Sequence, residues 1–358
     1  MTVFKSYLAD KSHVKHVGRT LFQGDILWLA LSGSGVEFDF QGKHLELSLQ
    51  GDDHAASIDA PLQDKVRIAV LIDGIRVIDD MITASEKNYT LIDSVMPHTY
   101  HIQVIKLSES PMSIVGIKKF AADENATLSP ANDKSRRVEF IGDSITCGYG
   151  VDDSNIEHAF STATEDVTRA YAYLTAQALD ADYSMVSYSG YGIISGFTES
   201  DERVADQLVP PYYPIIGFSR GTFKQEAIMG KAWDFTSFKP DLVVLNLGTN
   251  DDSYCQDKAD RQEEFTSSYQ KFLKEIRRLN PDSVLLCTYG IMNQRLYPCI
   301  EKAINDYKND SNDEKIYSMR FELYKESDGY VVNFHPSFRT HSQAAWKLVQ
   351  KIKEIMNW

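Results

Sequence analysis

The apolar run DLVVLNLG, residues 241–248, constrains the fold of this chain more than any other stretch. Near-continuous apolar strands are typical of a parallel sheet that is buried on both faces. Similar short strands are expected at VEFIG (138–142), YSMVSYSG (183–190) and SVLLCTYG (283–290). Amphipathic helix patterns occur over residues 165–179, 265–279 and 344–356. Strands that alternate with helices predict an α/β domain with a mainly parallel sheet.

The first 120 residues show a different pattern. GVEFDFQG, HLELSLQGDD and TYHIQVIKLSES alternate polar and apolar residues between Gly, Asp and Ser turns, which predicts an all-β sandwich or barrel. The pair Asp73–Gly74 in VRIAVLIDGIRVID predicts a β-hairpin. Residues 121–137 are polar and aperiodic and are interpreted as a linker. We therefore expect a β-domain over 1–125 and an α/β domain over 135–358.

The charge balance and the cysteines limit which binding partners and which cellular compartment are expected for the chain. With 37 basic and 51 acidic residues, the net charge of −14 opposes binding to nucleic acid or anionic lipid, whereas a neutral sugar is not repelled. The N-terminus lacks a basic segment followed by an apolar run, and no window approaches eighteen apolar residues. The four cysteines have no metal-type spacing, which favours free thiols. We expect a cytoplasmic protein without membrane, metal or other cofactor, and a homo-oligomer stays open.

Ligands of parallel sheets bind beyond the carboxyl ends of the strands, and several loops at such places carry unusual residues. In GDSITCGYG, residues 142–150, Ser144 would project its hydroxyl above the sheet while the following helix aims N–H groups at the same space. Asp143 and Ser144 could instead simply cap that helix. In NFHPS, His335 suits a general base, because the ordinary pKa of histidine is about 6.5, or it is a structural loop residue.

Two further loops offer hydrogen-bond donors. Gly190 in SGYG allows a close backbone approach to a ligand, and its alternative role is a tight turn. Asn250 in NLGTND could donate its side-chain amide to a developing oxyanion, and its alternative role is an Asx turn. Each loop alone has a purely structural interpretation, but the loops occur in order at predicted strand ends.

Taken together, these blocks resemble the SGNH hydrolase superfamily, also called GDSL esterases: Ser144 in GDSIT, Gly190 in SGYG, Asn250 in GTND and His335 in FHPS. RRVEFIGDSITCGYG, WDFTSFKPDLVVLNLGTND and the strand-rich first part are similar to carbohydrate esterase family 2, a group of acetylxylan esterases. The resemblance implies an N-terminal jelly-roll sandwich joined to a three-layer α/β/α SGNH domain. It also implies a serine esterase that removes O-acetyl groups from plant-type carbohydrates, with acetylated xylo- or manno-oligosaccharides as substrates.

The resemblance also implies roles for these residues. Ser144 would be the nucleophile and His335 the general base. The backbone N–H groups of Ser144 and Gly190 and the amide of Asn250 would bind the oxyanion. Lipid-directed esterases and thioesterases of the same superfamily are an alternative, as is a catalytically weakened carbohydrate-binding protein.

One position departs from the family pattern. Asn333 occupies the slot two residues before His335 where an aspartate is expected. An amide cannot stabilise the imidazolium charge, and in the serine-protease template the same change costs about ten-thousand-fold in turnover. We favour a Ser–His dyad in which a main-chain carbonyl or Asn333 orients the histidine. Alternatively Asp328 folds back to serve, or an aspartate has been replaced and activity is weak.

The remaining candidates lie around these loops. The long stretch 193–232 contains PPYYPIIGFSRGTF, whose aromatic rings Tyr212, Tyr213 and Phe218 would suit sugar faces or would pack within a surface loop. Asp143 and Asp251 are expected to brace loops rather than to transfer protons. His341 is expected to be structural. Thr340 or Ser342 is expected to cap the last helix.

Overall fold

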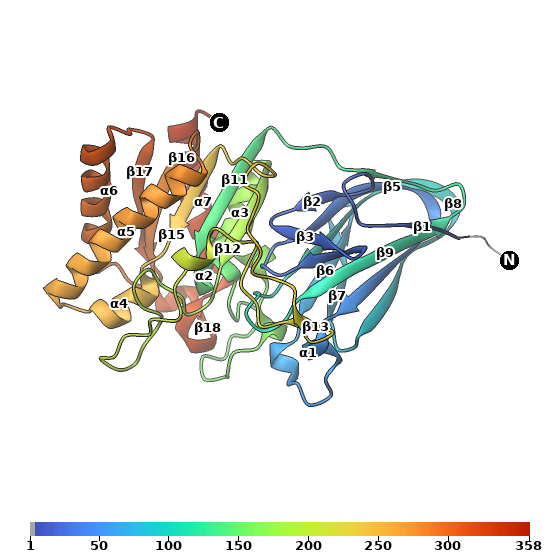
Figure 1. Ribbon diagram of the computed structural model, residues 1–358, viewed down its shortest axis with the longest axis horizontal. Coiled ribbons are helices and arrows are strands. Elements are labelled where there is room, and N and C mark those ends of the chain that lie inside the picture. The colour runs from blue at the N-terminus through green and yellow to red at the C-terminus, as the bar shows by residue number, and fades with distance from the viewer. Residues whose placement is uncertain (1–3) are drawn as a thin grey trace. The chain divides into compact units, whose positions relative to one another are not determined.

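The computed structural model describes residues 4–358, so the first three residues of the predicted N-terminal domain lie outside the described residues. The chain forms two compact units (Figure 1). The first unit holds the chain up to Asp133 together with Ser161–Glu165 and Ile215–Ala232. The second unit holds Lys134–Phe160, Asp166–Pro214 and Trp233–Trp358. The expected continuous domain over 135–358 is therefore wrong at two segments that belong to the first unit.

The first unit is built on one antiparallel sheet (Figure 1). Its strands are β1 (Phe4–Tyr7), β2 (Lys15–Val17), β3 (Thr20–Gln23), β4 (Ile26–Leu29), β5 (Gly35–Gly51), β6 (Arg67–Ile72), β7 (Ile75–Met81), β8 (Glu86–Lys106), β9 (Val115–Asp123) and β10 (Thr127–Pro130). Their order is β3-β4-β9-β5-β8-β6-β7, with β1 on β9 and with β2 and β10 on β5. The Asp73–Gly74 hairpin is confirmed, since it joins β6 to β7 with φ of 51° and 80°.

Strand β5 organises the core of this unit. The sequence suggested two strands, but one strand of 17 residues runs through both, with an irregular register between Gly42 and His44. Before this irregularity β5 pairs with β10, and after it with β9. Alternate side chains such as Phe38 and Leu47 are fully buried, and the Phe38 ring lies 4.7 Å from that of Phe120.

The segment interpreted as a linker is mostly strand. Residues 121–137 contain the end of β9, all of β10 and the start of β11 (Arg136–Gly142). Leu128 of β10 is only 7% exposed, and its strand completes its hydrogen bonds on β5. The pairing partner lies about ninety residues away along the chain, so local periodicity gave no sign of it.

The second unit contains the predicted parallel sheet (Figure 1). Its strands are β11, β12 (Ala181–Ser187), β15 (Leu242–Asn246), β16 (Val284–Ile291) and β17 (Ile316–Leu323), in the order β12-β11-β15-β16-β17. Its helices are α2 (Ser144–Cys147), α3 (Tyr171–Ala178), α4 (Thr249–Cys255), α5 (Ala259–Leu279), α6 (Tyr297–Ser311) and α7 (Phe338–Met356). Helix α3 packs beside α7, and α5 beside α6. Because β12, β11 and β15 are adjacent and parallel, the loops that follow them share one edge of the sheet.

Short elements complete the two units. They are α1 (Asp53–Ala56), β13 (Thr222–Phe223) and β14 (Glu226–Ala227) in the first unit and β18 (Tyr330–Val331) and β19 (His335–Pro336) in the second, with 3₁₀ turns η1 (Leu62–Asp64), η2 (Thr162–Thr164), η3 (Val167–Arg169), η4 (Pro210–Tyr212), η5 (Glu326–Asp328) and η6 (Val332–Phe334). Within residues 4–358, no helix combines the length and the apolar character that crossing a bilayer requires.

The cap of helix α7 differs from the prediction. Ser337 is the N-cap, and its Oγ accepts a hydrogen bond from the N–H of Thr340. Thr340 itself is buried inside the first turn, and Ser342 donates its hydroxyl to the carbonyl of Phe338 at 2.8 Å. The helix thus begins earlier than its apolar pattern suggested, directly after the HPS sequence.

Candidate active site

Ser144 lies beyond the carboxyl end of strand β11, which is flanked by β12 and β15, and it is the first residue of helix α2. Gly142 makes the sharp turn possible, because a Cβ there would stand 2.0 Å from the Thr146 hydroxyl. Asp143 caps the short helix α2 by accepting a hydrogen bond from the N–H of Ile145 at 3.0 Å. Asp143 therefore has the capping role that the sequence left open, while the Ser144 hydroxyl is left for another partner.

That partner is His335. Its Nε2 lies 2.8 Å from the Ser144 Oγ, although the two residues are 191 positions apart in sequence. Its Nδ1 lies 3.2 Å from the backbone carbonyl of Val332. A carbonyl only accepts, so Nδ1 carries the proton and Nε2 is the acceptor for the serine hydroxyl. This is the tautomer that a general base for Ser144 requires.

Asn333 does not face the imidazole through its side chain. Its Nδ2 donates to the hydroxyl of Tyr149 at 2.8 Å. The Tyr149 ring stacks on that of His335 with centroids 4.1 Å apart, and on that of Phe160 at 4.2 Å. Asn333 thus restrains the ring that packs against the base. Tyr149 and Phe160 were missed by the sequence analysis, although Tyr149 lies within the GDSITCGYG block.

Asp328 does not replace the missing carboxylate. Its Oδ1 lies 3.2 Å from the Nε of Arg339 and 3.5 Å from the Nε2 of Gln343. The geometry around His335 therefore corresponds to a Ser–His dyad whose histidine is oriented by the main-chain carbonyl of Val332. That carbonyl carries no sequence signal.

The predicted oxyanion donors Gly190 and Asn250 follow β12 and β15, the two strands that flank β11. Gly190 follows β12 with φ of +82°, a left-handed conformation that favours glycine. Within the described chain, the N–H groups of Ser144 and Gly190 have no hydrogen-bond acceptor. Asn250, in the first turn of α4, uses one amide hydrogen for the carbonyl of Tyr191 at 2.8 Å, which leaves its second hydrogen for a ligand.

Asp251 braces the loop that contains Gly190. Its carboxylate accepts from the N–H groups of Ile193 at 2.9 Å, Ile194 at 2.7 Å and Ser195 at 3.2 Å. Burial raises the pKa of Asp251 to about 6 and that of Asp143 to about 7. Both carboxyls are fully buried, which fits the expected bracing role and not a place in a proton-transfer path.

Burial has the opposite effect on the two histidines. It lowers the pKa of His335 to about 4, so the ring is neutral at pH 7 and can accept a proton. It lowers the pKa of His341 to about 3. His341 is 1% exposed, and its Nδ1 accepts from the N–H of Tyr171 at 3.2 Å, so it has the expected structural role.

The three aromatic candidates have different environments. Tyr213 is fully buried, and its hydroxyl donates to Glu139 at 2.6 Å, so the expected sugar contact is wrong for this residue. Phe218 belongs to the first unit, in the segment Ile215–Ala232, rather than to the unit that contains Ser144. Tyr212 is half-buried and lies beside Tyr191, with centroids 6.1 Å apart, next to the Gly190 loop.

Together these groups can cleave an ester. A neutral base next to a serine hydroxyl generates the nucleophile, and preorganised N–H groups stabilise the negative oxygen that forms on attack.

Comparisons with known proteins agree with this geometry. Residues 140–349 match the model of the GDSL-like lipase/acylhydrolase family, and residues 16–131 match that of the carbohydrate esterase 2 N-terminal domain. The cellulase/esterase CelE of Acetivibrio thermocellus is 28% identical over 91% of this chain, but the match covers only 38% of that relative's length. An acetylxylan esterase/glucomannan deacetylase of Cellvibrio japonicus is 22% identical over 98% of this chain and 91% of its own.

A solved structure has the same architecture. The family two carbohydrate esterase from Clostridium thermocellum, in complex with cellohexaose, superposes with a TM-score of 0.82 at 28% identity, over 96% of this chain and 99% of the other. On these matches, the chain belongs to the GDSL-like lipase/acylhydrolase family and carries the N-terminal domain of carbohydrate esterase family 2.

Proposed function

We propose that the protein is a serine esterase that removes O-acetyl groups from plant-type carbohydrates through an acyl-enzyme. The observation that carries the proposal is the 2.8 Å contact between the Ser144 Oγ and the His335 Nε2. The N–H groups of Ser144 and Gly190, which have no acceptor among residues 4–358, add to its support. The names of the relatives support the acetyl group as the acyl part and xylan or glucomannan as the alcohol part.

The reaction proceeds in two half-cycles. The Nε2 of His335 takes the proton of Ser144 as the Oγ attacks the acetyl carbonyl, and the N–H donors and the Asn250 amide hold the oxyanion. The tetrahedral intermediate collapses, the C–O bond to the sugar breaks, and His335 returns its proton to the departing sugar hydroxyl. A water molecule then repeats the sequence on the acetyl-serine and releases acetate. The Val332 carbonyl holds the ring in one tautomer throughout.

The substrate is proposed to be an oligosaccharide met in a reducing compartment, the cytoplasm. All four cysteines are free, and three of them, Cys147, Cys255 and Cys287, are buried. A test compares rates on short acetylated xylo- or manno-oligosaccharides with rates on insoluble acetylated xylan. Faster release from the short oligomers supports this part of the proposal, and equal rates contradict it.

The main experiment uses the variant Ser144→Ala. We expect the parent protein to release acetate from acetylated xylo- or manno-oligosaccharides, and the variant to lose at least about a thousand-fold in turnover with unchanged folding. A quenched reaction should show acetyl added to the Ser144 peptide by mass spectrometry. Unchanged deacetylation by Ser144→Ala overturns the mechanism. A preference for octanoyl over acetyl nitrophenyl esters would instead identify a lipid-directed esterase or thioesterase.

A second candidate is sugar binding with weak catalysis. It is favoured by the neutral Asn333 in place of an aspartate and by the cellohexaose complex of the Clostridium thermocellum relative. Calorimetry with oligosaccharides separates the two candidates, because this one predicts binding without turnover of nitrophenyl acetate.

We also propose the finer fold that the family implies, a jelly roll for the first unit and three α/β/α layers for the second. Support comes from β5, which changes its pairing partner at the Gly42 irregularity, and from the helix pairs α3 with α7 and α5 with α6.

A further inference from the structure

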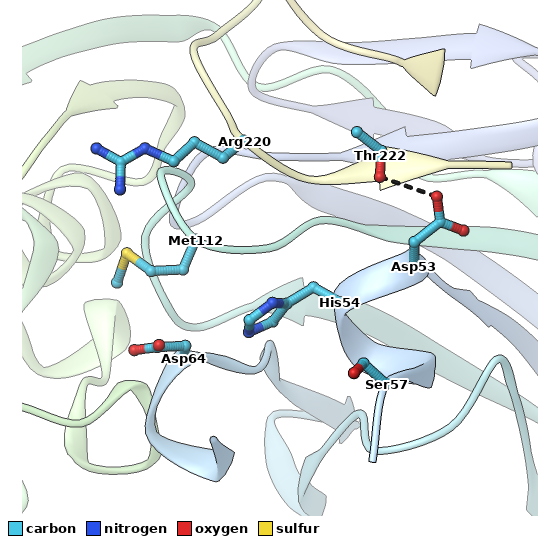
Figure 2. Close-up of a pocket in the computed structure, with 7 residues that line it drawn as sticks. All are labelled: Asp53, His54, Ser57, Asp64, Met112, Arg220 and Thr222. Atoms are coloured by element: carbon cyan, nitrogen blue, oxygen red, sulfur yellow. Dashed lines mark hydrogen bonds between the residues drawn. The ribbon is translucent and has the colours of Figure 1, made fainter. Parts of the chain in front are cut away.

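The first unit contains a cavity of about 400 Å³ that is lined mostly by residues with polar side chains (Figure 2). Its volume lies within the range of small-molecule sites. Asp53, His54 and Ser57 come from α1 and the residue after it, and Asp64 comes from η1. Arg220 and Thr222 come from Ile215–Ala232, which we call the returning segment because it belongs to the first unit although it follows β12 in the chain. None of the groups proposed for catalysis lines this cavity.

Buried hydrogen bonds fix the walls of the cavity. Asp52 is 1% exposed and accepts from the N–H of Ala55 at 2.7 Å, the hydroxyl of Ser113 at 2.9 Å and the N–H of Ile114 at 2.9 Å. These bonds tie α1 to the loop before β9, which carries the cavity residue Met112. The wall formed by α1 is thus held in place before any ligand arrives, which reduces the entropy cost of binding.

The returning segment is tied to the same helix. Asp53 accepts from the Thr222 hydroxyl at 2.8 Å, the N–H of Lys224 at 3.0 Å and the N–H of Gln225 at 2.7 Å. Figure 2 shows the contact between Asp53 and Thr222 at one side of the cavity. These bonds place Arg220 at the cavity, where its backbone N–H also bonds the carbonyl of Pro111 at 3.0 Å.

Two nitrogen-bearing side chains of the cavity lack partners. Among the residues that the structure describes, the Arg220 guanidinium makes no ion pair or hydrogen bond, although acidic residues outnumber basic ones by 51 to 37. The Nε2 of His54 is buried without a hydrogen-bond partner. A buried polar atom that stays unpaired destabilises the folded state. The Arg220 side chain is exposed, so its guanidinium is free to exchange water for an acceptor-bearing ligand, and His54 Nε2 can donate to or accept from the same ligand according to its tautomer.

The opposite side of the cavity has acceptors. Figure 2 shows Arg220 and Asp64 on either side of the Met112 side chain. The planar guanidinium of Arg220 can donate two parallel hydrogen bonds to a ligand carboxylate. An ionised Asp64 only accepts hydrogen bonds and would repel a ligand carboxylate. Asp64 and the hydroxyl of Ser57 suit the hydroxyl groups of a ligand, and Met112 offers an apolar surface to its C–H groups. The ligand should therefore carry a carboxylate at one end and hydroxyls at the other.

We propose that this cavity binds a uronic acid residue of an acidic oligosaccharide, with its carboxylate on Arg220 and its hydroxyls toward Asp64 and Ser57. The choice of a saccharide as the ligand rests on the proposed function. The expectation of a carboxylate and hydroxyls rests on the cavity residues alone. The first unit would thus have its own site for an acidic sugar, and neither Ser144 nor His335 lines that site.

The test measures binding of two matched sugars to the full chain by calorimetry and ligand-observed NMR. Methyl β-D-glucuronide and methyl β-D-glucoside differ only in a carboxylate or a hydroxymethyl group. We expect the glucuronide to bind at least tenfold more tightly. Arg220→Gln should weaken glucuronide binding at least tenfold. Lys224→Gln is the matched control, since it removes the same charge from the same segment outside the cavity lining and should leave binding unchanged.

The outcomes separate this inference from the proposed function. Acetate release from nitrophenyl acetate should be the same for the parent, Arg220→Gln and Lys224→Gln, and equal unfolding temperatures show that the variants fold. Glucuronide binding without esterase activity would support the cavity and contradict the esterase. Equal binding of the two sugars, binding of neither, or an Arg220→Gln variant that binds like the parent overturns the inference.

Discussion

His335 illustrates how one residue depends on surroundings that are distant in sequence. Because burial lowers its pKa to about 4, the neutral base persists well below the ordinary histidine range. Activity requires the neutral ring, so kcat/KM should stay level from pH 7 down to about pH 5 and should halve near pH 4. Initial rates on a soluble acetyl ester between pH 3.5 and 8 check this. An acid limb near pH 6.5 would contradict it.

Acid unfolding must be followed in the same experiment. The unfolded chain protonates its histidines below about pH 6.5, whereas folded His335 and His341 resist protonation down to about 4 and about 3. The contribution of these two histidines to stability is therefore lost progressively as the pH falls below 6.5, whereas buried Asp143 and Asp251, whose pKa values are raised, contribute stability that grows over the same range. Circular dichroism at each pH separates a loss of fold from protonation of the base.

A second prediction concerns the side chain of Asn333. Asn333→Asp should keep turnover within about threefold, because Tyr149 can donate to the new carboxylate and Val332 still orients the ring. The acid limb should move to higher pH, since a nearby negative charge favours imidazolium. Asn357→Asp is the control, because Asn357 is also exposed and left-handed, with φ of 55° against 50° for Asn333.

A turnover loss above tenfold in folded Asn333→Asp would show that the amide has a specific role. The sequence could predict that Ser144 and His335 meet, because their residue types and positions at predicted strand ends suit a nucleophile and its base. The oxyanion roles of Gly190 and Asn250 stay predictions. It could not predict what orients the histidine, because a main-chain carbonyl has no residue type.

Among the secondary-structure elements, helix α7 restrains the loop that carries the base His335. Its N-cap, Ser337, accepts from Thr340 and also donates to the carbonyl of Asp328 at 2.6 Å, which closes the loop that carries His335. Ser337→Ala should lower the free energy of unfolding by about 1 kcal/mol. It should also lower kcat a few-fold, because the base loses a restraint.

Urea denaturation and initial rates measure these two effects. Ser342→Ala is the matched control, since this hydroxyl bonds only back to Phe338 within the helix, and its loss should be neutral. Equal effects of the two substitutions would contradict the role of the cap.

Elements with strong local periodicity, such as α5, could be predicted from the sequence, whereas β10 could not, because it depends on a distant partner in β5.

The first unit as a whole depends on chain that follows β12 in sequence. The side chain of Arg19 is fully buried and donates to the carbonyl of Ile215 at 2.8 Å. The ring of Trp28 packs on that of Phe223, with centroids 5.0 Å apart. No local pattern marks residues 215–232 as part of an earlier domain, so the sequence could predict two domains but not this exchange.

A fragment of residues 1–133 should therefore be unstable. Loss of these contacts should lower its unfolding midpoint by roughly 10 °C or more relative to the full chain. Calorimetry of the fragment with and without a synthetic peptide of residues 215–232 measures this, and the peptide should raise the midpoint. A fragment as stable as the full chain would show that the returning segment contributes nothing to the unit.

The returning segment also limits how such a gene can recombine. A crossover at the codon for residue 133 would pair one parent's β-unit with another parent's residues 215–232, which evolved against a different surface. Chimaeras of this kind would inherit mismatched side chains in the cavity as well as in the core. Residues 1–133 and 215–232 should consequently be inherited together during evolution.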